Sequence, residues 1–72
     1  MEAYIQLSED QWKYILDNRL IIPINCHYIN EYGLHSLIVK ERELKQLMEH
    51  ISDNDNIIRP TLQKAGKNMF GW

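Results

Sequence analysis

The chain has 72 residues, of which 44% are hydrophobic, and a formal net charge of −2 at pH 7. This length predicts one domain, and a disulfide framework within the chain is excluded because Cys26 is the only cysteine. The weak charge excludes a strong general attraction to nucleic acid, and it also excludes a heavily acidic mimic of DNA.

So short a chain buries only a modest core, which rarely supplies more than about 3–5 kcal/mol. We expect neither a metal nor another cofactor, because Cys26 and the three histidines lack the close pairing typical of zinc ligands. The longest purely apolar run, residues 20–22, is too short for a membrane span or a signal peptide. A lone cysteine is typical of the reducing cytoplasm, which is the expected location. We expect oligomerisation, or docking on a larger partner, to supply further stability, and we predict a homodimer.

The N-terminal part of the chain predicts a strand followed by a helix. Apolar and polar residues alternate over residues 3–7, which is typical of a half-buried strand. Ser8 and Gln11 have the spacing of a capping box, so a helix is expected over residues 9–18, with Asn18 as a left-handed end. The expected buried stripe of this helix is Trp12, Ile15, Leu16 and Leu20.

Residues 20–30 and 34–40 are predicted to be two strands joined by a turn, in which Gly33 can take a positive φ. A turn of two or four residues would place even residues of the first strand beside odd residues of the second. The face predicted to meet the helices is then Ile22, Ile24, Cys26, Tyr28, His35, Leu37 and Val39. The opposite face would be a partner-binding surface, or would be covered by the end of the chain, and its candidate residues are His27, Ile29, Leu34 and Ile38.

The hairpin also contains the residues that most resemble a chemical site. Cys26 and His27 fall on opposite faces of a regular strand, so they cannot share a metal ion. Cys26 and His35 share a face as diagonal neighbours, which makes a Cys–His dyad geometrically possible. We favour the alternative that Cys26 is a small core residue, because the sequence shows no third orienting group and no glycine elbow. We therefore predict no catalytic residue and no enzyme.

A second helix is predicted over residues 41–52. Its apolar residues recur at the spacing i, i+3, i+4 and i+7, which forms one continuous stripe. Glu41 precedes Lys45 by four residues, the favourable order for an ion pair on a helix. The stripe predicted to be buried is Leu44, Leu47, Met48 and Ile51.

The charge is divided unevenly along the chain. Residues 1–56, which we take as a compact α+β domain, carry ten acidic and five basic side chains. Residues 57–72 carry three basic side chains and no acid, and Pro60 and Gly66 interrupt any period. Since Trp and Phe are strong interface anchors, this C-terminal segment is expected to dock on the molecule, to dock on a second subunit or to bind a partner. Its candidate partner-binding residues are Lys64, Lys67, Met69, Phe70 and Trp72.

The order strand–helix–strand–strand–helix predicts a small single α+β domain, with helices on one face of a three-stranded sheet and a C-terminal segment. The sequence leaves open whether the first two strands are parallel neighbours. The expected function is a non-catalytic protein-binding module that modulates or inhibits a larger protein, in the manner of an immunity protein, an antitoxin or a phage-encoded host modulator. Such a module would be a bacterial or phage accessory protein. The alternative is a small nucleic-acid-binding protein that uses the basic, aromatic C-terminal segment.

Overall fold

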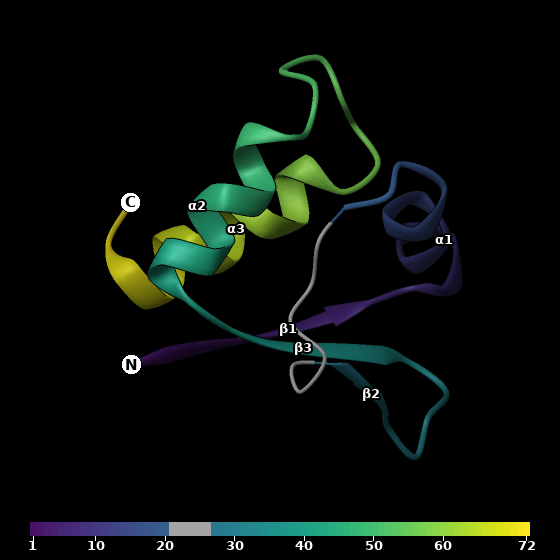
Figure 1. The fold of residues 1–72 in the computed structure, drawn as a ribbon. Coiled ribbons are helices and arrows are strands. Elements are labelled where there is room, and N and C mark those ends of the chain that lie inside the picture. Colours follow the sequence, from purple (N-terminus) through teal and green to yellow (C-terminus); the bar gives the residue numbers. More distant parts are fainter. Residues whose placement is uncertain (21–26) are drawn as a thin grey trace.

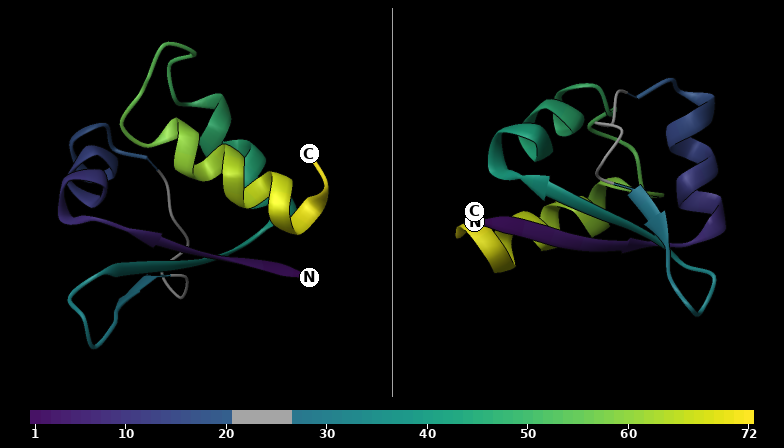
Figure 2. Two further views of the ribbon diagram at one scale, coloured as in Figure 1. Left: turned by 180° about the vertical axis from the view of Figure 1, so that it is seen from behind. Right: turned by 60° about the horizontal axis from the view of Figure 1, so that its bottom comes forward.

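The computed structural model describes residues 1–20 and 27–72, and within these it shows a three-stranded sheet and three helices (Figure 1). The helices lie on one face of the sheet, so the molecule has two layers (Figures 1 and 2). The predicted fold class, a small single α+β domain, is confirmed. The elements in chain order are β1 Glu2–Leu7, α1 Glu9–Asp17, β2 His27–Ile29, β3 His35–Lys40, α2 Glu41–Glu49 and α3 Arg59–Phe70.

The strand order in the sheet is β1-β3-β2, and both outer strands are antiparallel to β3. The first two strands of the chain are therefore not neighbours, because β3 lies between them. Every second residue of β1 is buried, as alternation in a half-buried strand requires. The core combines these residues with others from β3, all three helices and the loop before α3: Ala3, Ile5, Leu7, Ile15, Leu37, Val39, Leu44, Leu47, Ile51, Ile58 and Leu62.

The register between β2 and β3 differs from the predicted one. Tyr28 is the cross-strand partner of Ser36, and Ile29 is the partner of His35. Odd residues of β2 therefore share a face with odd residues of β3, and the prediction that Tyr28 faces the helices beside His35 is wrong. The members of the predicted set that lie outside the described residues are Ile22, Ile24 and Cys26.

The hairpin loop explains this difference. The side-chain oxygen of Asn30 accepts hydrogen bonds from the backbone N–H groups of Tyr32 and Leu34, at 2.9 and 3.0 Å. This arrangement, in which an Asn side chain organises the following backbone, produces a loop of five residues, 30–34. An odd loop length reverses the pairing expected for two or four residues. Gly33 has a φ of 76°, so its predicted positive φ is confirmed.

Helix α1 begins as predicted. Ser8 Oγ accepts the N–H of Gln11 at 3.2 Å, and Gln11 Oε1 accepts the N–H of Ser8 at 3.0 Å, which completes the capping box. The end of the helix is different, because Asn18 has a φ of −93° and the left-handed conformation belongs to Arg19, with φ 53°. Leu16, which was predicted to be buried, is 58% exposed and lies outside the core.

Replacing the cap tests how much of α1 depends on it. Ser8→Ala removes the acceptor for the Gln11 N–H, and we expect the free energy of unfolding to fall by about 1 kcal/mol. The side chain of Gln11 also donates to the Ile57 carbonyl at 3.0 Å and to Thr61 Oγ1 at 2.9 Å, so Gln11→Ala should destabilise the protein more than Ser8→Ala. Urea unfolding followed by circular dichroism measures both effects. Equal values for the two variants would contradict this order.

Helix α2 confirms the predicted apolar stripe, although it ends at Glu49 rather than at residue 52. Leu44, Leu47 and Ile51 are buried, and Met48 packs against the core. The predicted ion pair between Glu41 and Lys45 is also present, with 3.8 Å between Glu41 Oε2 and Lys45 Nζ.

Helix α3 was not predicted. Pro60 lies in the first turn of α3. The backbone N–H groups of a first turn have no acceptor within the helix, so the N–H that proline lacks is not missed there and Pro60 starts the helix rather than breaking it. Gly66 is buried within the helix, and the helix ends at Phe70, followed by Gly71 in the left-handed conformation with a φ of 73°. Every fourth residue from Ile58 to Phe70 turns toward the rest of the molecule, and Figure 1 shows α3 packed beside α2. Across residues 1–20 and 27–72, no helix has the length and apolar character needed to cross a bilayer.

Candidate protein-binding surface

The histidine considered for a dyad is part of a packed aromatic pair. His35 is 5% exposed, its ring is stacked on that of Trp12 at a centroid distance of 5.1 Å, and its Nε2 lies 2.7 Å from Glu9 Oε2. This arrangement orients the imidazole between α1 and β3. Its proposed dyad partner, Cys26, lies outside the described residues. Among the residues that the structure describes, no group of three or more His, Cys, Asp or Glu side chains is placed to hold a metal ion.

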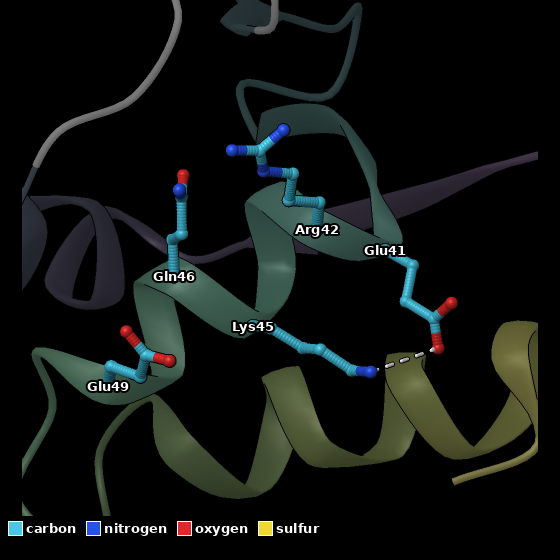
Figure 3. Close-up of a pocket in the computed structure, with 5 residues that line it drawn as sticks. All are labelled: Glu41, Arg42, Lys45, Gln46 and Glu49. Atoms are coloured by element: carbon cyan, nitrogen blue, oxygen red, sulfur yellow. Dashed lines mark ion pairs between the residues drawn. The ribbon is translucent and has the colours of Figure 1, made fainter.

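A hollow on the solvent side of α2 is lined by polar side chains that do not converge on one point (Figure 3). Lys45 and Glu41 extend toward α3, whereas Arg42 and Gln46 point away from it. A catalytic site requires groups that converge on a reacting atom, and these side chains diverge. The surface of α2 therefore resembles a solvated helix face, and the carboxylate of Glu41 accepts a hydrogen bond from Trp72, as described below.

The start of α3 is fixed by Asp55, a half-buried carboxylate. Asp55 Oδ2 accepts the N–H groups of Ile58 and Arg59 at 2.9 and 2.8 Å. Burial by itself would raise the pKa of Asp55, but hydrogen bonds from these backbone groups and from the Tyr14 hydroxyl outweigh it, so the pKa is below its ordinary value. Burial, followed by the negative charge of Asp55, raises the pKa of Tyr14. Asp55 thus joins α1 to α3.

Arg59 joins α3 to the end of α2. Its guanidinium donates to the backbone carbonyls of Met48, at 2.9 Å, and of Ile51, and its Nε donates to the Ser52 carbonyl at 2.8 Å. These carbonyls belong to the last turn of α2 and the residues after it, where helix carbonyls lack partners of their own. The side chain of Arg59 is only 14% exposed, so this cation is a structural clamp with little contact with solvent.

With α3 held in place, its C-terminal end positions Trp72. The indole ring lies directly on Gly66, because a Cβ atom at that position would overlap the ring. The indole Nε1–H donates to Glu41 Oε2 at 2.9 Å, and the backbone N–H of Trp72 donates to the Gly66 carbonyl at 3.4 Å. The ring of Phe70 lies 6.2 Å from the indole, centroid to centroid. Trp72 is thus fixed by contacts on both α2 and α3 while 38% of the residue stays exposed.

Two hollows lie beside this tryptophan. One, of about 330 Å³, is lined by Met48, Gln63 and Trp72 together with the charged ends of Lys45 and Glu49. The other, of about 410 Å³, is lined by Met1, Glu41, Met69 and Phe70, of which Glu41 and Phe70 also contact Trp72. The exposed apolar residues Met1, Met69 and Trp72, together with these two hollows, are called the Trp72 surface below.

The structure separates the hairpin residues that were predicted to share one partner-binding face. His27 and Ile29 are cross-strand partners of β3 residues on the helix side of the sheet, whereas Ile38 pairs with Tyr4 on the opposite side. Leu34 lies in the hairpin loop and is half-buried. A single surface made of these four positions is therefore wrong, for the reason of register given above, and their individual roles in binding stay predictions.

The five candidate partner-binding residues of the C-terminal segment lie closer to one another than the four hairpin candidates do. Lys64 and Lys67 are exposed on α3, Met69 is exposed near its end, and Phe70 packs against the core beside Trp72. All five lie on the last two turns of α3 and the two residues after it. The sequence could indicate these residues by type, but it could not show that Gly66 is the platform for Trp72 or that Glu41 binds its indole.

A second surface is the sheet face that the helices leave open (Figures 1 and 2), which the sequence predicted but with a different set of residues. Tyr4 is 71% exposed and Tyr28 is 49% exposed, and the register places both on this side. The alternation of residues 3–7 had already indicated that Tyr4 points away from the core. The face, called the open sheet face below, comprises Tyr4, Gln6, Tyr28, Ser36 and Ile38.

Known proteins contribute no functional information about either surface. Comparisons of the chain with protein-family models, with curated proteins and with solved structures found no significant match. Assignment of a function therefore depends on the contacts, exposure and charge of the Trp72 surface and of the open sheet face themselves.

Proposed function

We propose that the protein is a non-catalytic protein-binding module that uses the Trp72 surface to bind, and so to modulate or inhibit, a larger protein. The observation that carries this proposal is the fixed position of Trp72, whose ring is held between Gly66 and Glu41 yet stays 38% exposed. Tryptophan is among the residues that most often dominate binding energy at protein interfaces. The module would act by occupying the partner's surface, in the manner of an immunity protein or an antitoxin.

Preorganisation makes this tryptophan a better anchor than a mobile one. A side chain that is immobilised on binding costs roughly 0.5–1.5 kcal/mol. Trp72 is already ordered by the contacts with Gly66 and Glu41, so most of that cost is met during folding. Met1 and Met69, which lie beside it, are unbranched and can adapt to the shape of a partner. The two hollows of the Trp72 surface offer places for side chains of the partner.

Charge favours a protein partner with acidic groups near its binding site. Lys64 and Lys67 are exposed on α3, the helix that ends at Phe70, and residues 57–72 contain no acid. The acids that line the two hollows, Glu41 and Glu49, come from α2, which also contributes Lys45. Nucleic-acid binding, the alternative function, has less support. Arg59 donates to backbone carbonyls within the fold, which leaves two lysines on this helix to contact phosphates. Such a contact would be weak and strongly dependent on salt.

Substitution of Trp72 is the direct test. Trp72→Ala is expected to weaken binding to the partner about tenfold or more, because it removes the central anchor. The partner is first captured from cells of the source organism with the full chain as bait, and its affinity is then measured with purified proteins by calorimetry. Tyr32→Ala is the matched control, since Tyr32 is an exposed aromatic residue in the hairpin loop.

Gly66→Ala distinguishes an ordered anchor from a merely apolar one. The added methyl group occupies the position of the indole, so Trp72 must leave its platform although it is still present in the chain. We expect intermediate affinity and a change in tryptophan fluorescence. Unchanged affinity in both Trp72→Ala and Gly66→Ala would contradict the proposed role of the Trp72 surface.

A further inference from the structure

We infer that the open sheet face binds a second copy of this chain, so that two sheets pack face to face about a two-fold axis near Ser36. This inference concerns a different surface from the proposed function, because the Trp72 surface belongs to the helical layer and the open sheet face lies on the other side of the sheet (Figures 1 and 2). Two copies joined in this way would present one Trp72 surface each.

The composition of the open sheet face is unusual for a face in contact with water. Antiparallel sheets can leave one face solvated, and such faces usually carry polar residues at alternate positions. Here Tyr4 and Tyr28 are large and largely exposed, and Ile38 lies next to Tyr4 across the strands. Tyrosine supplies a rigid apolar ring together with a hydroxyl group, a combination that is enriched in interfaces. These side chains form an apolar area that a second sheet can cover.

The charge of this face selects a second copy over a charged partner. The described strand residues on this side that carry charge are Glu2 and Lys40, one acid and one base, and they are cross-strand partners. The centre of the face is uncharged, so it attracts neither a polyanion nor a strongly charged protein. Two identical faces bring no excess of like charge together, and a two-fold axis allows each Glu2 to approach a Lys40 of the other copy.

The hydrogen-bonding groups of the face are also self-complementary. Gln6, Ser36 and Tyr28 form one row across all three strands, with Ser36 on the central strand. Hydroxyl and amide groups both donate and accept, so each can pair with its own kind in an identical face. Ser36 is 4% exposed, and within residues 1–20 and 27–72 its Oγ has no hydrogen-bond partner. A polar group from a second copy would satisfy this buried hydroxyl, which otherwise destabilises the fold.

The shape of the row supports the same arrangement. Ser36 is small and lies between two longer side chains, Gln6 and Tyr28. Sheets that pack face to face interdigitate large residues with small ones. Because Ser36 is 4% exposed, a tyrosine of the second copy can lie over it only when the side chains that cover it move aside, and the symmetry of the axis repeats this contact in the opposite direction.

The experiment is sedimentation velocity of the full chain over a range of concentrations up to high micromolar. We expect a monomer–dimer equilibrium for the wild type. Tyr4→Glu places two like charges in the buried contact and should weaken the dimer about tenfold or more. Leu16→Glu is the matched control, because Leu16 is 58% exposed on α1, in the helical layer, and its substitution should leave the dimer unchanged. Circular dichroism verifies that each variant folds, and Tyr28→Glu replaces Tyr4→Glu if the latter does not.

The outcomes separate this inference from the proposed function. A wild-type monomer at the highest concentration overturns the inference, and so does a dimer that survives both tyrosine substitutions. Trp72→Ala should sediment as the wild type does while it loses the partner, whereas Tyr4→Glu should keep the partner and lose the dimer. If Trp72→Ala instead abolished the dimer, the open sheet face would not be the contact between the two copies.

Discussion

Arg59→Ala is expected to lower the free energy of unfolding by about 3 kcal/mol. The guanidinium donates to the carbonyls of Met48, Ile51 and Ser52, and its side chain is 14% exposed. Hydrogen bonds from a charged donor contribute more than neutral ones, and the carbonyls at the end of α2 would lose their partners together. Because α3 is held to α2 by this residue, loss of the clamp should also loosen Trp72.

Urea unfolding of matched variants measures this effect. Arg59→Lys keeps the positive charge but lacks the fork of donors, so it should lose about half of the stability that Arg59→Ala loses. Lys64→Ala removes an exposed cation from the same helix and should change stability by less than about 0.5 kcal/mol. A loss smaller than about 1 kcal/mol for Arg59→Ala would show that water replaces the guanidinium at these carbonyls.

The elements that the sequence predicted well depend on neighbours in the chain. The capping box of Ser8 and Gln11 involves residues three apart, and the stripe of α2 depends only on helical spacing. The turn at Gly33 follows from its freedom to adopt positive φ. In each case the physical cause lies within a few residues of its effect, so the pattern of residues contains enough information.

The features that the sequence predicted poorly depend on longer contacts or on loop geometry. The hairpin register changed because Asn30 organises a loop of five residues. Helix α3 was missed because Pro60 and Gly66 are usually helix breakers, although Pro60 lies in the first turn and Gly66 is needed beneath Trp72. The spacing of Ile58, Leu62, Gly66 and Phe70, four residues apart, would have indicated the helix had glycine been counted with the buried residues.

In the candidate surfaces too, features that depend on residue type or local pattern were predicted, and features that depend on long-range contacts were not. Residue type alone indicated Trp72 and Met69 as interface residues, but the bond from the indole to Glu41 joins positions 31 residues apart. Tyr4 was correctly expected to point away from the core, whereas Tyr28 was placed on the wrong side by the register. An open sheet face was therefore predicted from the sequence, but Tyr28 could be placed on it only once the pairing of β2 with β3 was known.

Asp55→Ala is expected to lower the free energy of unfolding by about 2 kcal/mol at neutral pH. It removes the acceptor of the Ile58 and Arg59 N–H groups at the start of α3, and it leaves the Tyr14 hydroxyl without this partner. Asp55→Asn keeps an acceptor oxygen without the charge, so it should retain part of the stability. Tyr14→Phe removes a single neutral donor and should cost less than Asp55→Ala, which urea unfolding can verify.

The pH dependence of stability identifies the charge of Asp55 as the cause. The pKa of this carboxyl is lower in the folded protein than its ordinary value of 3.8, so the folded state binds the proton less readily than the unfolded chain does. The resulting stabilisation is complete above pH 3.8 and is lost as the pH falls through the folded pKa. The difference in stability between wild type and Asp55→Asn should therefore be constant near neutral pH and should shrink below pH 3.8. A difference that stays the same under acidic conditions would mean that packing, rather than the carboxylate charge, accounts for the effect of Asp55.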